Sequence, residues 1–401
     1  MSSSTADKIS ACLATEGQQF NFPPLPVDIH FGYGAFTDLA RHVRRCGGKK
    51  AIIITDRGLR RTGWIDYGEE LLRAEGIPYA VYDDVPENSS TSAVAAAVAR
   101  LRDFKAEVIV GIGGGSALDT AKAVAAMATN PGSVADYKGL NNIDCDPLPC
   151  VCVPTAAGTG SEVSIWSVIT DDQTNAKFGV GSQKLLPRIA LCDPELTFGL
   201  PPALTAATGM DALSHAVESY TSKESQPISA SLAIGAIELI GRHLRTAVVD
   251  GTNRAARYGM LLGSMMALMA MNSTRCGIAH ALAMPMGSGD LRIHHGTIVG
   301  MLLPEVTRFN HMAAPERYAA IARAMGAPVA GLTVEEAAPH AVDAIQDLGA
   351  DVGMPSRFSQ FGMREAHIGP VVQAAMQSDN IRVNPRTPEP TDLEGILQRL
   401  I

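Results

Sequence analysis

The sequence predicts an α/β N-terminal half, built on a parallel, Rossmann-like sheet, and an all-α helical C-terminal half. Apolar, β-branched runs alternate with helical stretches early in the chain, whereas nearly every segment after Leu200-Pro201-Pro202 has helical period. The length of 401 residues is comfortable for two hydrophobic cores. We therefore expect two domains, 1–200 and 201–401, with the boundary at about residue 200.

The first half contains apolar runs that read as strands. The expected strands are Lys50–Thr55, Tyr79–Tyr82, Glu107–Ile112 and Leu148–Val153. Helices are expected at Thr91–Phe104 and Ser116–Ala128. This alternation is typical of parallel strands covered by helices on both faces of the sheet. Residues 164–192 carry shorter alternating runs and predict a hairpin rather than another strand–helix unit.

The second half repeats helical periodicity. The expected helices include Ile228–Val249, Ala255–Met271, Glu316–Met325, Val334–Leu348 and Asp392–Ile401. A helix with an apolar stripe must bury that stripe against other helices, so these segments predict one packed helical domain.

Composition excludes several classes of function. The formal net charge of −8 disfavours binding to nucleic acids or anionic membranes. No apolar run reaches the ~18 residues that span a bilayer, and the N-terminus lacks the pattern of a secretory signal. The seven cysteines are scattered and form no C-x-x-C pair, so we expect no disulfide framework, no thiolate zinc site and a cytoplasmic location.

A glycine-rich turn indicates dinucleotide binding. Gly111-Ile-Gly-Gly-Gly-Ser116 follows an expected strand and opens an expected helix. Glycines let a pyrophosphate approach the backbone, and the helix N-terminus presents free N–H groups. Ser116 departs from the common G-x-G-x-x-G pattern, and an ordinary tight turn is the alternative. Asp56 ends an earlier strand, where a carboxylate can bind a ribose and repel a 2′-phosphate, or simply cap a helix.

Four side chains from the helical half suggest a metal site. Asp211 and His215 are four residues apart on a helix, so they share one face. Alone, this pair is better explained by an ordinary hydrogen bond between the two side chains. His280 and His295 also lie among apolar residues, and one carboxylate with three imidazoles suits Zn²⁺ or Fe²⁺.

In order along the chain, several motifs resemble the iron-containing (group III) alcohol dehydrogenases, from about residue 24 to the end. These motifs are Ile54–Leu59, Gly113–Ser116 with Asp119 and Lys122, Pro154–Glu162, Asp193–Thr197, Gly209–His215 and His295–Pro304. The resemblance implies a dinucleotide-binding domain, a helical metal domain and NAD-linked oxidoreductase activity.

The resemblance also implies roles for individual residues. The implied metal ligands are Asp211, His215, His280 and His295. Asp56 stands where the family favours NAD over NADP. The implied cofactor contacts are Asn88, Gly113, Gly114, Gly115, Ser116, Asp119, Thr155, Thr159 and Lys177.

The chain departs from the family around its last ligands. Met284 stands where many members carry a histidine that handles protons, and His294 replaces the usual proline before His295. His280 and His295 are fifteen residues apart, one more than is common. His294 could relay protons instead, and Arg292 could pair with an anionic substrate tail. The alternative is a solvated loop with both side chains pointing outward.

We therefore expect a metal-dependent, NAD(H)-linked alcohol dehydrogenase or aldehyde reductase that uses Fe²⁺ (or Zn²⁺). The substrate is expected to be a short-chain alcohol or aldehyde, and the protein a homo-oligomer, a dimer or larger. One rival is a metal- and NAD-dependent lyase like dehydroquinate synthase, but the Gly209–His215 motif argues against it. Another is a catalytically silent protein that binds the same cofactors, which Met284 slightly favours.

Overall fold

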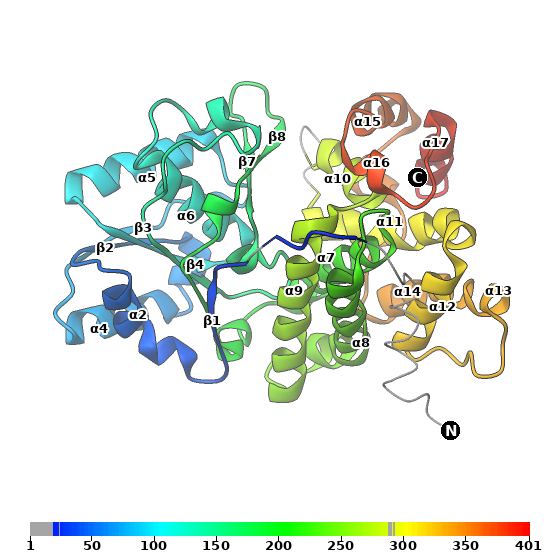
Figure 1. Cartoon of the computed structure of the whole chain (residues 1–401), viewed down its shortest axis with the longest axis horizontal. Helices are drawn as coiled ribbons and strands as arrows, with labels where there is room; N and C mark the ends of the chain where they lie inside the picture. Colours follow the sequence, from blue (N-terminus) through cyan, green and yellow to red (C-terminus); the bar gives the residue numbers. More distant parts are fainter. Residues whose placement is uncertain (1–18, 24, 288–290, 292) are drawn as a thin grey trace. The chain divides into compact units, whose positions relative to one another are not determined.

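The computed structural model describes residues 19–23, 25–287, 291 and 293–401 (Figure 1). The chain forms two compact units: one is Pro24–Leu200, and the other contains Pro201–Ile401 together with the described residues before Pro24. The unit before Leu200 contains the strands and is of α/β type, whereas Pro201–Ile401 is helical. The predicted fold class is confirmed. Among the described residues, no helix is both long enough and apolar enough to cross a membrane.

The α/β unit is built on a six-stranded, wholly parallel sheet with the order β1-β9-β6-β4-β2-β3. The strands are β1 (Asp28–Phe31), β2 (Ala51–Ile54), β3 (Tyr79–Tyr82), β4 (Val108–Gly113), β6 (Cys150–Pro154) and β9 (Ile189–Cys192). Strands β2, β3, β4 and β6 match the expected runs to within two residues. The sequence did not predict the four-residue strand β1, and residues 189–192 return to the main sheet instead of ending the hairpin.

The same unit also contains a second, three-stranded sheet. It consists of β5 (Gly139–Leu140), β7 (Trp166–Thr170) and β8 (Lys177–Gly181). Strands β7 and β8 pair antiparallel, which confirms the predicted hairpin. Thr170, at the end of β7, also forms an isolated β-bridge with Ser90, the N-cap residue of the earlier helix α5 (Thr91–Phe104).

Helices cover both faces of the main sheet, as the all-apolar strand β2 requires. Ile52 and Ile54 pack in one core with α5 and α6, and Ile53 packs in a second core with α2 and α4 (Figure 1). The helices of this unit are α2 (Leu39–Arg45), α3 (Arg57–Arg60), α4 (Trp64–Ala74), α5 (Thr91–Phe104) and α6 (Gly115–Met127). Its 3₁₀ turns are η1 (Ala35–Asp38), η2 (Val134–Tyr137), η3 (Ser161–Val163), η4 (Gln183–Leu185) and η5 (Pro194–Thr197).

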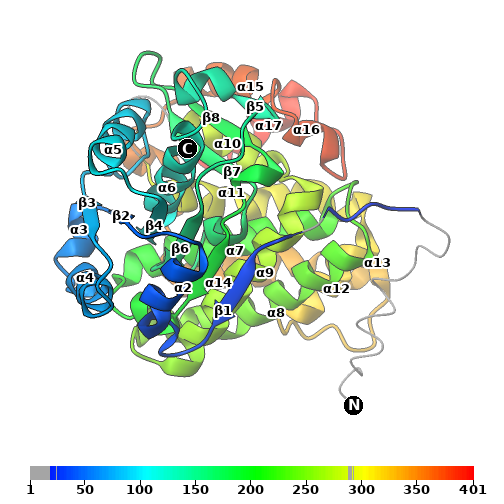
Figure 2. The same ribbon diagram turned by 60° about the vertical axis from the view of Figure 1, so that its left-hand side comes forward.

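The helical unit is organised around α7 (Pro202–Thr221), which is buried along most of its length. Helices α8 (Pro227–Val249) and α9 (Arg254–Thr274) run side by side against it, and α11 (His295–Asn310) packs on it as well (Figure 2). The remaining helices are α10 (Ile278–Met286), α12 (Pro315–Ala324), α13 (Val334–Ala337), α14 (His340–Asp351), α15 (Ile368–Ala375), α16 (Asn380–Val383) and α17 (Pro390–Gln398). Its 3₁₀ turns are η6 (His311–Ala313), η7 (Phe358–Phe361) and η8 (Glu365–His367). The single helix expected over 334–348 is divided, because Pro339 precedes α14.

Candidate functional site

Asp211 lies at the centre of a buried group of imidazoles in the helical unit. Its Oδ1 is 3.7 Å from Nε2 of His280, which is on α10. The same oxygen is 3.8 Å from Nε2 of His295, the first residue of α11. His215 lies one turn beyond Asp211 on α7, and its ring stacks on that of His280 with 4.5 Å between centroids. The structure thus brings all four side chains of the expected metal site together.

Electrostatics and hydrogen bonding in this group suit a cation. Burial opposes ionisation of Asp211, but the imidazoles of His215, His280 and His295 outweigh burial and hold the pKa of that carboxyl well below its usual range. Within the described part of the chain, the buried Asp211 Oδ1 and His280 Nε2 have no hydrogen-bond partner. Buried polar atoms are costly when unsatisfied, and a metal ion between them would satisfy both. The residues present therefore fit a divalent metal.

Glu218 orients His280 through the ring nitrogen that does not face Asp211. Nδ1 of His280 donates to Oε2 of Glu218 over 2.6 Å, and the backbone N–H of Ala279 donates to Oε1 over 2.7 Å. Glu218 is buried and lies three residues beyond His215 on α7. Because a carboxylate only accepts, this bond fixes the proton on Nδ1 and leaves the Nε2 lone pair for a metal. Sequence reasoning missed Glu218, although its helical spacing from Asp211 and His215 was a usable signal.

Cys276 is a further member of the group that sequence reasoning set aside. Its Sγ, one nitrogen of His215 and one nitrogen of His280 all lie within 4.8 Å of one another. Cys276 is buried, and burial raises the pKa of its thiol. Asp211, His280 and His295 form a second set of potential ligands with the same mutual spacing.

Gly296 explains how His295 reaches Asp211. A Cβ atom at Gly296 would overlap the backbone carbonyl of Ala207 on α7, and it would lie 3.2 Å from Cβ of Asp211. Only glycine therefore lets the first turn of α11 pack this closely on α7.

His294 precedes α11 as its N-cap and is half-buried, with a buried Nδ1 atom. Arg292 lies outside the described residues, and Met284 is half-buried on α10, one turn beyond His280.

The glycine turn of the α/β unit joins β4 to α6. Gly113 has a φ of 154°, and a Cβ there would lie 2.6 Å from Cβ of Ala117. A Cβ on Gly115 would lie 2.6 Å from Cγ2 of Thr159. At Gly114, by contrast, a Cβ would meet no described atom within 4 Å. Gly113 and Gly115 are thus needed for the fold of the turn, whereas Gly114 leaves open space before the N-terminus of α6.

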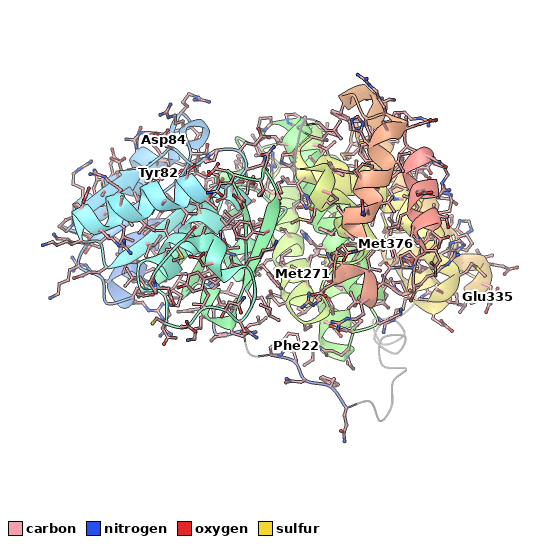
Figure 3. The ribbon with its side chains drawn as sticks, turned by 90° about the horizontal axis from the view of Figure 1, so that it is seen from above. Phe22, Tyr82, Asp84, Met271, Glu335 and Met376 are labelled. Atoms are coloured by element: carbon pink, nitrogen blue, oxygen red, sulfur yellow. The ribbon has the colours of Figure 1, made fainter. Side chains whose placement is uncertain are left out.

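This turn lies at the point where the strand order of the sheet reverses. From β2 the chain proceeds outward to β3, and from the neighbouring β4 it proceeds in the other direction to β6. Ligands of open parallel sheets bind at the carboxyl ends of strands at such a point. Asp56 lies two residues after β2, and its side chain caps α3 by accepting from the N–H of Leu59 over 2.9 Å. Its backbone forms an isolated β-bridge with Asp84, which lies two residues after Tyr82, the end of β3 (Figure 3). Oδ2 of Asp56 would be 3.6 Å from a Cβ on Gly113.

Other expected cofactor residues border the same edge. Ser116 Oγ donates to the carbonyl of Glu87, which precedes the exposed Asn88. The N–H of Thr155 donates to the carbonyl of Gly113 over 3.0 Å. Lys177 is farther along, on β8 opposite Thr170, whose N–H donates to the carbonyl of Ser89 over 2.7 Å. The segments that carry these expected residues are thus linked by hydrogen bonds.

Asp119 differs from the other expected cofactor residues, because its carboxylate already forms hydrogen bonds and an ion pair within the protein. It accepts from Ser161 Oγ over 2.6 Å and from the N–H of Val168 over 3.0 Å, and Lys122 Nζ lies 3.2 Å away. Lys122 is buried and also donates to the backbone carbonyls of the 161–166 segment. These contacts assign Asp119 to the support of the loop that carries Thr155 and Thr159.

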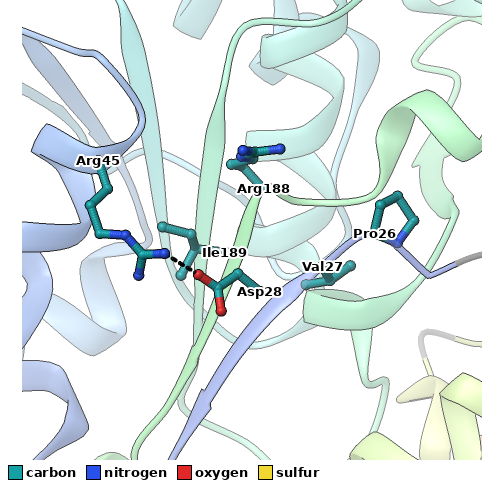
Figure 4. Close-up of a pocket in the computed structure, with 6 residues that line it drawn as sticks. All are labelled: Pro26, Val27, Asp28, Arg45, Arg188 and Ile189. Carbon is teal, nitrogen blue, oxygen red and sulfur yellow. Dashed lines mark hydrogen bonds and ion pairs between the residues drawn. The ribbon is translucent and has the colours of Figure 1, made fainter.

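One cavity of the α/β unit lies at the other edge of the sheet. It has a volume of about 280 Å³ and surrounds the first residues of β1 and β9, Asp28 and Ile189 (Figure 4). Arg45 closes one side through a 2.6 Å ion pair with Asp28. Because the strands are parallel, this cavity is at the amino ends and is separate from the glycine turn.

An α/β unit with a glycine turn at the strand reversal, together with helices that carry an Asp–His cluster, defines a class of two-part, metal-centred enzymes. The chain belongs to the iron-containing alcohol dehydrogenase family: residues 26–194 match "Iron-containing alcohol dehydrogenase", and residues 205–401 match "Fe-containing alcohol dehydrogenase family, C-terminal".

Named relatives agree with this assignment. The chain is 38% identical over 371 residues to 1,3-propanediol dehydrogenase of Klebsiella pneumoniae, covering 92% of this chain and 96% of the relative. It is 35% identical over 370 residues to sulfoacetaldehyde reductase of Bilophila wadsworthia, covering 92% and 95%.

Solved structures share the fold. The crystal structure of a 1,3-propanediol oxidoreductase has a TM-score of 0.93 at 38% identity and covers 96% of this chain and 100% of its own. That of sulfoacetaldehyde reductase from Bifidobacterium kashiwanohense in complex with NAD⁺ has a TM-score of 0.85 at 31% identity, covering 96% and 99%.

Proposed function

We propose that this protein is a metal-dependent, NAD(H)-linked alcohol dehydrogenase or aldehyde reductase that interconverts a short-chain alcohol and its aldehyde. The observation that carries the proposal is the buried pair Asp211 Oδ1 and His280 Nε2, 3.7 Å apart, neither with a hydrogen-bond partner among the described residues. This pair marks a cation site in a chain that belongs to the iron-containing alcohol dehydrogenase family.

Asp211, His215, His280 and His295 are the proposed ligands of Fe²⁺ (or Zn²⁺). When bound, such an ion supplies Lewis-acid polarisation of an alcohol or aldehyde oxygen. Glu218 fixes the tautomer of His280, and the packing of Gly296 on α7 sets the approach of His295. The protein's own contribution at this centre is therefore to orient the ligands and to exclude bulk water from the buried Asp211.

The α/β unit is the proposed dinucleotide-binding domain, and residues 201–401 form the proposed metal-binding domain. Bound NAD(H) supplies the hydride chemistry. The open space at Gly114 and the N–H groups that begin α6 suit a pyrophosphate. Asp56, at the strand reversal, is placed to accept from a ribose and to disfavour NADP. The remaining proposed cofactor contacts are Asn88, Gly113, Gly115, Ser116, Thr155, Thr159 and Lys177. Asp119 supports these contacts indirectly.

His294 and Arg292 are the proposed catalytic residues that distinguish this chain. His294 is half-buried next to the proposed ligand His295, which suits proton transfer at neutral pH. Arg292 would pair with an anionic substrate tail. One relative is named for its reduction of sulfoacetaldehyde, an aldehyde with such a tail, and this supports the proposal.

The proposed activity is tested by NADH oxidation with a panel of short aldehydes, using protein loaded with Fe²⁺ or Zn²⁺. His280→Ala should lose both the bound metal and turnover, whereas His311→Ala, at a partly exposed site in η6, should keep both. Elemental analysis that still finds one ion per chain after His280→Ala would refute the ligand assignment. Metal-loaded protein that binds NADH but turns over no aldehyde or alcohol would favour the silent or lyase alternatives.

The homo-oligomer is a separate prediction, and light scattering tests it by measuring the molar mass in solution.

A further inference from the structure

The donor atoms around His280 form two overlapping sets. Asp211, His280 and His295 offer oxygen and nitrogen, whereas His215, Cys276 and His280 offer nitrogen and sulfur. Within each set the donor atoms lie within 4.8 Å of one another, and His280 is common to both. Such mutual spacing allows a single ion to contact all members of a set after small side-chain movements.

His280 cannot serve two ions at the same time. Its Nδ1 donates to Glu218 over 2.6 Å, which leaves the single Nε2 lone pair for a metal. An ion held by the sulfur set must therefore share the centre with, or displace, an ion held by the oxygen set. The two sets describe one centre with two chemical preferences rather than two independent sites.

Sulfur alters which metal this centre prefers. Thiolates bind Zn²⁺, Cd²⁺ and other soft ions strongly, whereas carboxylate and imidazole ligands also suit harder ions such as Mn²⁺ and Fe²⁺. Cys276 is buried within the group, so an ion that binds its sulfur does so away from bulk solvent. Binding would break the S–H bond and form a metal–sulfur bond, and the proton would pass to the solvent.

We propose that Cys276 is an additional ligand of the metal centre, used by thiophilic ions together with His215 and His280. The centre thereby takes up Zn²⁺ or Cd²⁺ in preference to Mn²⁺ and exchanges its catalytic ion when soft metals are present. This inference rests on the metal centre of the proposed function, and it adds a ligand that strengthens the preference for soft ions beyond that of the Asp–His group alone.

The experiment uses the full-length protein freed of metal and titrated separately with Co²⁺, Cd²⁺ and Mn²⁺. Co²⁺ and Cd²⁺ bound to a thiolate give ultraviolet sulfur-to-metal charge-transfer bands, which oxygen and nitrogen ligands do not. The wild-type protein should show these bands at one ion per chain. Cys276→Ala should abolish them and weaken Cd²⁺ binding about tenfold or more, while Mn²⁺ affinity stays unchanged.

Cys150→Ala is the matched control, because Cys150 is also a buried cysteine but lies on β6 in the other unit. It should retain both the bands and the Cd²⁺ affinity. The wild-type spectrum requires no mutation, so it decides the question even if Cys276→Ala misfolds.

Two results would overturn the inference. One is a stoichiometric Co²⁺ or Cd²⁺ complex of the wild type without a charge-transfer band. The other is a folded Cys276→Ala protein with an unchanged ratio of Cd²⁺ to Mn²⁺ affinity. Either result leaves the proposed function standing, because NADH turnover by the metal-loaded enzyme is measured separately.

Discussion

Nδ1 of His280 lies 2.6 Å from Oε2 of Glu218, and both side chains are buried in the helical unit. Carboxylates that hold a ligating imidazole in this way usually determine metal affinity as well as orientation. We expect Glu218→Gln to weaken metal binding by about 10–100-fold, as measured by competition with a chelator. Glu224→Gln, at an exposed position of the same unit, is the control and should bind metal normally. Equal affinities in the two variants would show that Glu218 has no such role.

The glycine turn allows cofactor binding to be separated from folding. Gly114→Ala adds a methyl group where no described atom lies within 4 Å, so the fold should tolerate it at a cost below about 1 kcal/mol. The methyl would, however, fill the space proposed for the pyrophosphate. We expect NADH affinity, measured by fluorescence titration, to fall at least about tenfold. Gly369→Ala also enters open space, on α15, and should leave NADH affinity intact. Normal NADH binding by Gly114→Ala would move the pyrophosphate site elsewhere.

Asp56 is expected to decide between NAD and NADP. A carboxylate near a 2′-phosphate, partly shielded from water, costs on the order of a few kcal/mol. Asp56→Ser removes the charge but keeps an oxygen that can cap α3, so the ratio of kcat/KM for NADH to that for NADPH should fall sharply. Asp66→Ser, at an exposed position on α4, should not change the ratio. Equal efficiency with both cofactors in the wild type would refute this role.

Periodicity predicted the central strands and most long helices, because those segments carry their burial pattern in consecutive residues. Strand β1 was missed because its four residues include polar Asp28 and His30 and are only partly buried, so it lacks the apolar run that revealed the equally short β2 and β3. Strand β9 was assigned to the hairpin because its partners, β1 and β6, are far away in the sequence. The prediction of a single helix over 334–348 was wrong, because Pro339 lies between two separate helices, α13 and α14.

Site residues were predictable to different degrees for a similar reason. Asp211 and His215 share a helix face, so their proximity follows from spacing alone. Glu218 was missed although it follows them on the same helix, whereas Cys276 joins the group only when the segment that leads into α10 approaches α7, a tertiary contact that no local pattern encodes. Asp119 was expected at the cofactor, but its oxygens face Ser161, Val168 and Lys122, which the sequence alone does not bring together.

The altered segment before α11 is tested by substrate choice and by pH. If His294 relays protons, His294→Ala should lower kcat and change the pH profile of kcat near neutrality. His340→Ala, on α14, should not. If Arg292 pairs with an anionic tail, Arg292→Ala should raise KM for acidic aldehydes and leave neutral aldehydes of the same length unaffected. An unchanged pH profile would reject the relay, and equal effects on acidic and neutral substrates would reject the anion contact.

Glu162 should make stability depend on pH in the direction opposite to that of most carboxylates. It is 1% exposed in η3, and its Oε1 has no hydrogen-bond partner among the described residues. Burial raises its pKa from 4.5 to about 7, against the opposing effects of a backbone hydrogen bond and Lys122. Between these values the folded protein holds a proton that the unfolded chain releases. The stabilisation is therefore complete below about pH 4.5 and is lost as the pH rises through about 7.

Glu162→Gln keeps the shape of the side chain and cannot ionise, so its stability should not show this loss. The pKa difference corresponds to about 3 kcal/mol, and the variant should gain stability relative to the wild type by an amount of this order at about pH 8 but not at about pH 5. Thermal melts at the two pH values, with metal saturated, measure the difference. Glu70→Gln, at an exposed position on α4, should follow the wild type at both pH values. If Glu162→Gln also follows the wild type, Glu162 is ionised in the folded protein and its burial is compensated by groups other than those described.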